Sequence, residues 1–123
     1  MADLGLGIIQ ERFADIVWEK EPVGSGELVK ICDKEFGWKK TTTYTVLRKL
    51  IDKGLLQNDN GIVTSLISKD EFYSSRSRQI VDESFQGSLP AFVAAFVSGN
   101  RLSAKEADEI RRMIDEFSDN SGE

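Results

Sequence analysis

The side chains best suited to bind a ligand are concentrated between Trp38 and Asn58. This stretch holds five basic residues and one acidic residue, although the whole chain has a net charge of −5 and a pI near 4.8. Lysine and arginine neutralise phosphates, and threonine and tyrosine hydroxyls donate to phosphate oxygens or contact base edges. The candidate DNA-contacting residues are Lys39, Lys40, Thr41, Thr42, Tyr44, Thr45, Arg48 and Lys49. A local basic patch on an acidic chain predicts a selective binder of DNA.

Arg48 is the best candidate for recognising a base, because a guanidinium can donate two hydrogen bonds to the major-groove edge of guanine. The threonine methyl groups could contact thymine in the same groove. The alternative is a solvated helix that merely contains lysine and threonine. The elements around this stretch decide between the two interpretations.

Other classes of site find little support in the composition. The chain has no histidine, and its one cysteine, Cys32, excludes an internal disulfide and a multi-cysteine metal site. There is no nucleophile next to a general base and no glycine-rich phosphate loop, so we expect neither an enzyme nor a cofactor or metal. Cys32 is predicted to be a small buried thiol, with a redox sensor as the alternative.

Three helices are predicted before residue 54. The first spans about residues 6–20, and the second starts at Ser25 as its N-cap and stops at Gly37. The third spans about residues 41–53. Its inward stripe is Thr43, Val46, Leu47 and Leu50, which leaves Thr42, Tyr44, Thr45, Arg48 and Lys49 facing outward.

Two short apolar segments follow around an Asn60-Gly61 pair, which is a strong hairpin signal. Three helices followed by a hairpin is the order of a winged helix-turn-helix, in which the third helix enters the major groove. The fold class is therefore mostly α with a small β-hairpin. The hairpin has no Lys or Arg and carries Asp59 near its tip, so this wing is expected to add little affinity and to seal the core.

The second part of the chain is predicted to be helical and to lack a core of its own. Ser68 with Glu71, and Ser103 with Glu106, form S-x-x-E capping boxes that start two of its helices. We expect a winged-helix domain over residues 1–72 and a dimerisation domain over residues 73–123, since so few residues rarely fold alone. The stripes expected to meet a second copy are Leu89, Phe92, Val93, Phe96 and Val97, and Ile110, Ile114 and Phe117.

The chain also resembles a known family. "WKKTTTYTVLRKLIDKGLL" is similar to the W-x-x-x-T-x-x-T-L-L-x-R-L-x-x-K-G-x-L segment of the penicillinase repressor family (the BlaI/MecI/CopY type). "FADIVWEKEPVGSGELV" resembles its first helix and the break after it. "SKDEFYSS" and "FQGSLPAFVAAFVSGNRLSAKEADEIRRMIDEF" resemble its linker and dimerisation helices. The similarity extends over nearly the whole chain.

This resemblance implies a homodimeric repressor that binds a palindromic DNA operator and dimerises through its C-terminal helices. The DNA-facing residues that it implies are Lys40, Thr41, Thr42, Tyr44, Thr45 and Arg48. Antibiotic-responsive members are cleaved in response to a membrane sensor protease, and the matching bond here is Ala95–Phe96, with Ala where the better-known site has Asn. The copper-responsive branch has a C-terminal cysteine cluster, which "SDNSGE" lacks.

The start of the chain lacks the pattern of a signal peptide, and no apolar run approaches the ~20 residues that span a bilayer. We therefore expect a soluble, cytoplasmic protein without membrane insertion. The alternative to a DNA-binding repressor is a winged-helix module that binds another protein through its acidic wing and apolar helices.

Overall fold

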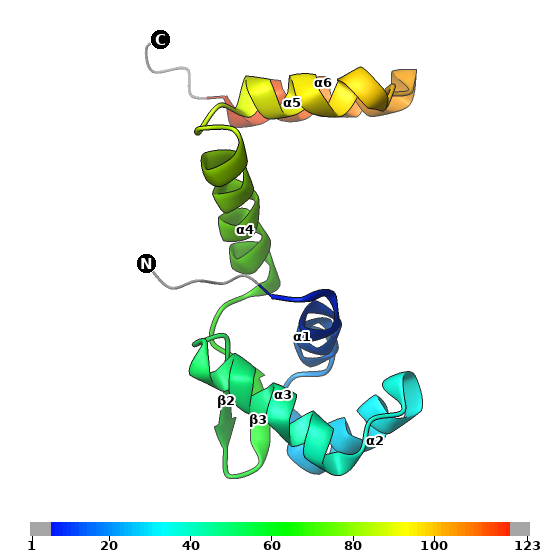
Figure 1. Ribbon diagram of the computed structural model, residues 1–123, viewed down its shortest axis with the longest axis vertical. Coiled ribbons are helices and arrows are strands. Elements are labelled where there is room, and N and C mark those ends of the chain that lie inside the picture. The colour runs from blue at the N-terminus through cyan, green and yellow to red at the C-terminus, as the bar shows by residue number, and fades with distance from the viewer. Residues whose placement is uncertain (1–5, 119–123) are drawn as a thin grey trace. The chain divides into compact units, whose positions relative to one another are not determined.

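A computed structural model describes residues 6–118, in which six α-helices and three short β-strands follow one another along the chain (Figure 1). The chain divides into two compact units, one ending at Gln79 and the other beginning at Ile80. The N-terminal unit contains α1 (Ile8–Lys20), α2 (Ser25–Phe36) and α3 (Lys40–Asp52). It also contains β1 (Val23–Gly24), β2 (Leu56–Asp59) and β3 (Ile62–Ser65).

The predicted hairpin is confirmed. β2 and β3 pair antiparallel, with Asp59 opposite Ile62, and Asn60 and Gly61 both have positive φ, at 52° and 86°. This is the turn chemistry that an Asn-Gly pair favours. β1 was not expected: it pairs antiparallel with β3 and gives a sheet of order β1-β3-β2. The N-terminal unit is thus a winged helix, as the order of elements predicts.

One core joins the three helices of the N-terminal unit to its sheet. The buried side chains that share this cluster include Phe13, Ala14 and Val17 of α1, Leu28 and Cys32 of α2, Leu47 and Leu50 of α3, Leu55, Leu56, Val63 and Phe72. α1, α3 and the hairpin are therefore fixed to one another by packing. The wing contributes Leu56 and Val63, in agreement with its expected role in sealing the core.

The ends of α2 show one error and one success of the sequence prediction. Ser25 is the first residue of α2, and Gly24 is its N-cap, so the assignment of Ser25 as the cap was wrong. The Ser25 backbone N–H instead donates to Gly61 O at 2.8 Å, because the strand pairing of β1 brings this segment against the hairpin turn. Gly37 ends α2 in the left-handed conformation, at φ 69°, as expected.

The C-terminal unit begins within α4 (Lys69–Ser84) and continues with α5 (Leu89–Gly99) and α6 (Ala104–Phe117). Both expected capping boxes are present. Ser68 Oγ accepts from Glu71 N while Glu71 Oε1 accepts from Ser68 N, and Ser103 and Glu106 exchange the equivalent pair of bonds. α5 and α6 contain no buried residue, which leaves their apolar stripes accessible in the single chain.

Candidate nucleic-acid interface

Three buried residues hold α3 in place. Thr43, Leu47 and Leu50 lie at i, i+4 and i+7, and none is more than 3% exposed. Val46, also expected on this stripe, is half-buried. A helix that packs on one side presents its opposite side in a constant position. A DNA-binding helix needs such a fixed position to make specific contacts.

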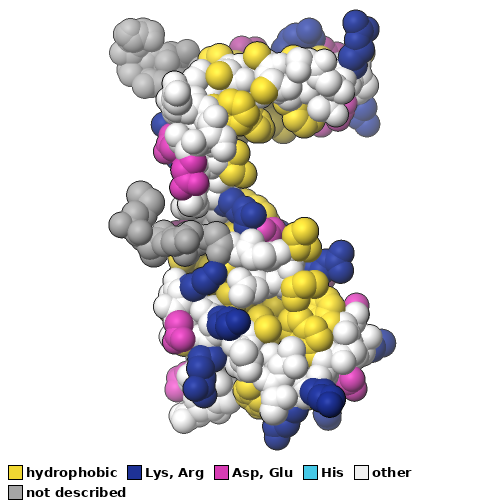
Figure 2. All heavy atoms as spheres, in the orientation of Figure 1, with side chains coloured by type: hydrophobic (Ala, Val, Ile, Leu, Met, Phe, Trp, Pro, Cys, Tyr) yellow, Lys and Arg dark blue, Asp and Glu magenta, His cyan; other side chains and the backbone are white. Residues whose placement is uncertain are grey.

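The outward side of α3 holds most of the residues expected to contact DNA. Those that the structure leaves exposed are Lys39, Lys40, Thr41, Thr42, Thr45, Arg48 and Lys49. Thr45 Oγ1 donates to Thr41 O at 2.9 Å, so its hydroxyl proton is used within the helix. The Thr45 side chain therefore offers an acceptor and a methyl group to a ligand. Figure 2 shows Lys and Arg side chains gathered along and around α3 on the face in view.

Tyr44 differs from the other candidates. Its ring is half-buried against the core, and its hydroxyl donates to Ser25 Oγ at 3.2 Å. The expectation that Tyr44 faces outward with the threonines is thus only partly met. Nothing in the sequence indicated this bond, because Ser25 is 19 residues away.

The turn between α2 and α3 forms a basic recess that sequence reasoning described only in part. A cavity of about 350 Å³ is lined by Val29, Lys30, Asp33, Gly37, Trp38, Lys39 and Lys40. Lys30, an exposed residue of α2, had not been singled out. The first turn of α3 contains no acidic residue, and no side chain caps it. Its free backbone N–H groups and the lysines together suit a phosphate.

The wing presents a different chemistry. Within it, Asn58 Oδ1 accepts from Gly61 N at 2.8 Å and Gln57 Nε2 donates to Thr64 Oγ1 at 3.0 Å. These bonds stiffen the hairpin without adding positive charge, and Asp59 is exposed next to the turn. Ile62 is also exposed, on the strand that follows.

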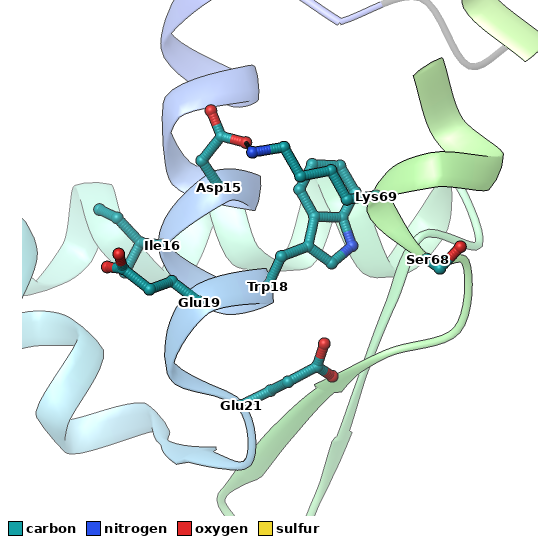
Figure 3. Close-up of a pocket in the computed structure, with 7 residues that line it drawn as sticks. All are labelled: Asp15, Ile16, Trp18, Glu19, Glu21, Ser68 and Lys69. Atoms are coloured by element: carbon teal, nitrogen blue, oxygen red, sulfur yellow. Dashed lines mark ion pairs between the residues drawn. The ribbon is translucent and has the colours of Figure 1, made fainter. Parts of the chain in front are cut away.

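A second hollow of the N-terminal unit, of about 540 Å³, contains several carboxylates (Figure 3). Its lining is Asp15, Ile16, Trp18, Glu19, Glu21, Ser68 and Lys69. Two of the carboxylates bind groups of the chain itself: Lys69 Nζ lies 3.5 Å from Asp15 Oδ1, and Glu21 accepts from the N–H and hydroxyl of Ser65. Asp15 and Glu21 therefore bind groups of the protein itself. Among residues 6–118, no group of three or more potential ligands is placed to hold a metal ion.

Cys32 is fully buried next to Thr43, which confirms the prediction of a buried thiol. Burial raises the pKa of the Cys32 thiol, and a hydrogen bond with Thr43 offsets part of that rise. A thiol with a raised pKa and no exposure reacts slowly, because the thiolate is the nucleophile.

The residues expected to meet a second copy remain largely exposed in the single chain. Leu89, Val93, Phe96 and Val97 of α5, and Ile110, Ile114 and Phe117 of α6, are all exposed; Phe117 is 78% exposed. Phe92 is half-buried and packs edge-on against Phe85, with ring centroids 5.3 Å apart. Met113, 55% exposed on α6, belongs to the same set and was not predicted. The Ala95–Phe96 bond lies inside α5.

Comparison with known proteins decides which family this architecture represents. A family model described as the penicillinase repressor matches residues 6–116. The chain belongs to the penicillinase repressor family. Its relatives include a penicillinase repressor of Bacillus licheniformis, 24% identical over 105 residues, or 82% of either chain. The methicillin resistance regulatory protein MecI of Staphylococcus aureus is 23% identical over 107 residues, which cover 84% of this chain and 87% of that protein.

Membership of the penicillinase repressor family confirms the resemblance found in the sequence. It identifies the chain as a repressor and not an enzyme. A further MecI protein, from Mammaliicoccus sciuri, is 23% identical over 104 residues, which cover 81% of this chain and 85% of that protein. Among the described helices, none combines the length and apolarity needed to cross a membrane.

Proposed function

We propose that this penicillinase repressor family member binds a palindromic DNA operator as a homodimer and blocks transcription from the promoter that contains it. The observation that supports this most directly is the basic, hydroxyl-bearing side of α3, which is exposed while Thr43, Leu47 and Leu50 fix the opposite side. Residues 1–72 bind DNA and residues 73–123 dimerise. In a dimer, two such helices enter successive major grooves about 34 Å apart.

The proposed contacts divide into two kinds. Lys39 and Lys40, with Lys30 across the recess, bind backbone phosphates at the start of α3. Thr41, Thr42 and Thr45 contact base edges, and Arg48 donates to guanine. The Tyr44 hydroxyl donates to Ser25 and so holds α3 against the start of α2. Lys49 binds a phosphate near the C-terminal end of α3. The wing, with Asp59 near its turn, adds little.

The dimer is supported by the exposed apolar stripes of α5 and α6. Isolated apolar residues on a surface are ordinary, but contiguous apolar patches mark interaction sites. A second copy of the chain covers both stripes at once, because a two-fold axis brings identical surfaces together. Repression ends when this dimer is weakened. Cleavage at Ala95–Phe96 after activation of a sensor protease would do so, since it divides α5.

Salt dependence tests the proposal. Binding to a duplex from the promoter region of the protein's own gene is measured as the salt concentration rises, with a slope of about −0.9 expected per phosphate contact. Arg48→Ala should weaken binding by about 1–3 kcal/mol and relax preference at one base pair. The control is Arg101→Ala, which removes the same charge from an exposed position outside the N-terminal unit. Binding that is insensitive to salt, or equal effects of both substitutions, would refute the proposal.

A second candidate is a winged-helix module that binds protein, which the acidic wing and the exposed Ile62 and Leu66 favour. The basic side of α3 does not favour it. Sedimentation separates the two proposals: a stable homodimer supports the repressor, whereas a monomer requires a different partner for the α5 and α6 stripes.

A further inference from the structure

The three exposed threonines of α3 differ in what their hydroxyl groups offer to a ligand. Thr45 Oγ1 donates to Thr41 O, four residues earlier, at 2.9 Å. Within residues 6–118, the hydroxyls of Thr41 and Thr42 have no hydrogen-bond partner. A hydroxyl group has one proton and two acceptor lone pairs. Thr41 and Thr42 therefore offer both a donor and an acceptor, whereas Thr45 offers an acceptor alone.

The same bond fixes the direction of the Thr45 methyl group. Threonine in a helix is divided between two χ1 rotamers, because its Oγ1 can bond a carbonyl three or four residues earlier. The bond to Thr41 O selects one of them, and the selected rotamer sets the positions of Oγ1 and Cγ2 together. Thr45 thus presents an acceptor and a methyl group in a constant arrangement.

Thr45 lies at the centre of the outward side of α3. At about 100° of rotation per residue, it is about 160° around the helix from both Thr43 and Leu47, which are buried. Thr41 lies one turn before it and Arg48 one turn after it, and both are exposed. When a helix with this arrangement enters a major groove, the residue opposite its buried stripe faces the base edges.

The major-groove edge of an A·T pair matches an acceptor next to a methyl group. Adenine presents its N6 amino group as a donor, and thymine presents its C5 methyl group. Guanine presents acceptors at N7 and O6, which a hydroxyl without a free proton cannot satisfy, and cytosine presents an amino group but no methyl group. The A·T pair alone supplies a partner for both groups of Thr45.

We propose that Thr45 is a specificity-determining residue that selects one A·T pair in each half-site of the operator. Its Oγ1 accepts a hydrogen bond from adenine N6, and its methyl group contacts the methyl group of thymine. The inference rests on the proposed function, in which α3 enters the major groove, and it deepens that function by assigning one base pair to one residue. The structural features that carry it all lie within α3.

The test uses base analogues that change one group at a time. Full-length wild-type protein first selects its operator from a random-sequence duplex library, and the bound duplexes are sequenced. Single thymines of the selected duplex are then replaced by uracil, which lacks only the C5 methyl group. Single adenines are replaced by unsubstituted purine, which lacks only the N6 amino group. Affinity for each duplex shows which pairs respond to either change.

For wild type, we expect one pair in each half-site that responds to both analogues. Uracil at this pair should weaken binding by about fourfold, the effect of one buried methyl group. Purine at the same pair should weaken binding by about fivefold, the usual net effect of one hydrogen bond.

Thr45→Ser and Thr45→Val separate the two groups. Serine keeps the hydroxyl and lacks the methyl group, so Thr45→Ser should bind thymine and uracil duplexes equally and still prefer adenine to purine. Valine keeps the methyl group, in one strongly preferred helical rotamer, and has no hydroxyl. Thr45→Val should therefore still prefer thymine to uracil and lose the preference for adenine.

Thr42→Ser is the matched control. It removes the same methyl group from another exposed threonine of α3, so it should leave both preferences at this pair intact. Purine also weakens the base pair itself, but that loss is common to all the proteins and cancels when each variant is compared with wild type. A residue that only stabilised α3 would weaken all duplexes by one factor and leave both preferences unchanged. Far-UV circular dichroism establishes that each variant is folded.

Two failures are distinguishable. If wild type selects no sequence from the library, the proposed function is wrong. If wild type selects an operator but no pair responds to both analogues, the assignment to Thr45 is overturned while the repressor function stands. The same conclusion follows if the folded Thr45 variants do not lose the two preferences in this crossed pattern, or if Thr42→Ser loses them as well.

Discussion

The hydroxyl of Tyr44 donates to Ser25 Oγ across 3.2 Å, which ties the candidate DNA-reading helix α3 to the first residue of α2. The backbone N–H of Ser25 in turn donates to Gly61 O, in the turn of the wing. These two bonds connect α3, α2 and the hairpin through one serine. Tyr44 thus fixes α3 to α2, while its neighbours Thr41, Thr42 and Thr45 remain exposed.

Tyr44→Phe removes this bond and keeps the ring. We expect the free energy of unfolding to fall by about 0.5–1.5 kcal/mol, the usual net value of one such bond. Base preference should not change, because the Tyr44 hydroxyl bonds Ser25 and does not contact DNA. Denaturant unfolding and affinity for matched and mismatched duplexes measure the two effects. Unchanged stability with altered base preference would show that Tyr44 contacts DNA itself.

Asp59→Lys tests the idea that the wing adds little affinity because of its charge. The substitution replaces an exposed carboxylate beside the wing turn with an ammonium group. If the wing lies near the DNA backbone, affinity should rise and the salt slope should steepen by about 0.9 for one new phosphate contact. Glu109→Lys, at an exposed position on α6, makes the same change in net charge and is the control. Equal gains from both would indicate a nonspecific effect of charge.

Much of the site could be predicted because it depends on local patterns. The stripe of Thr43, Leu47 and Leu50 follows from helical periodicity, and the start of α4 follows from the S-x-x-E pattern of Ser68 and Glu71. The hairpin follows from the backbone preference of Asn-Gly. Each of these signals lies within a few residues, so no knowledge of the tertiary structure is needed.

Several of the features that were missed depend on residues far apart in sequence. β1 has two residues, too few to show alternation, and forms only because β3 lies beside it. That pairing also draws Ser25 into α2 and away from the expected cap. The Glu11–Arg76 pair joins residues 65 positions apart, and each residue alone looks like an ordinary charge on an amphipathic helix. Pairings of this kind can be recognised only once the fold is known.

Cys32 provides a test of the core through pH. Burial raises the pKa of its thiol above the ordinary 9.0, so the folded state holds the proton more tightly than the unfolded state. The free energy of unfolding contributed by this group should be constant below pH 9 and should fall as the pH rises from there toward the higher folded pKa. Unfolding curves of wild type and Cys32→Ala are measured across this pH range. The difference between their free energies of unfolding reports the thiol, because all other groups titrate in both proteins. At pH 8, alkylation should be slow until the protein unfolds; rapid labelling of native protein would favour a redox role.

Phe96 is half exposed in the middle of α5, and the proposed dimer requires a second copy to cover it. Phe96→Asp would bury an unpaired carboxylate at that interface, which should cost about 3–5 kcal/mol of dimerisation free energy. Sedimentation should then show a monomer whose far-UV circular dichroism remains helical. The control is Ala91→Asp, which adds the same charge to an exposed position on the opposite side of α5. Because two linked half-sites bind more tightly than one, the monomer should also lose most of its affinity for a palindromic duplex while keeping its weak affinity for a half-site. A dimer that survives Phe96→Asp would place the self-interface on another surface of the chain.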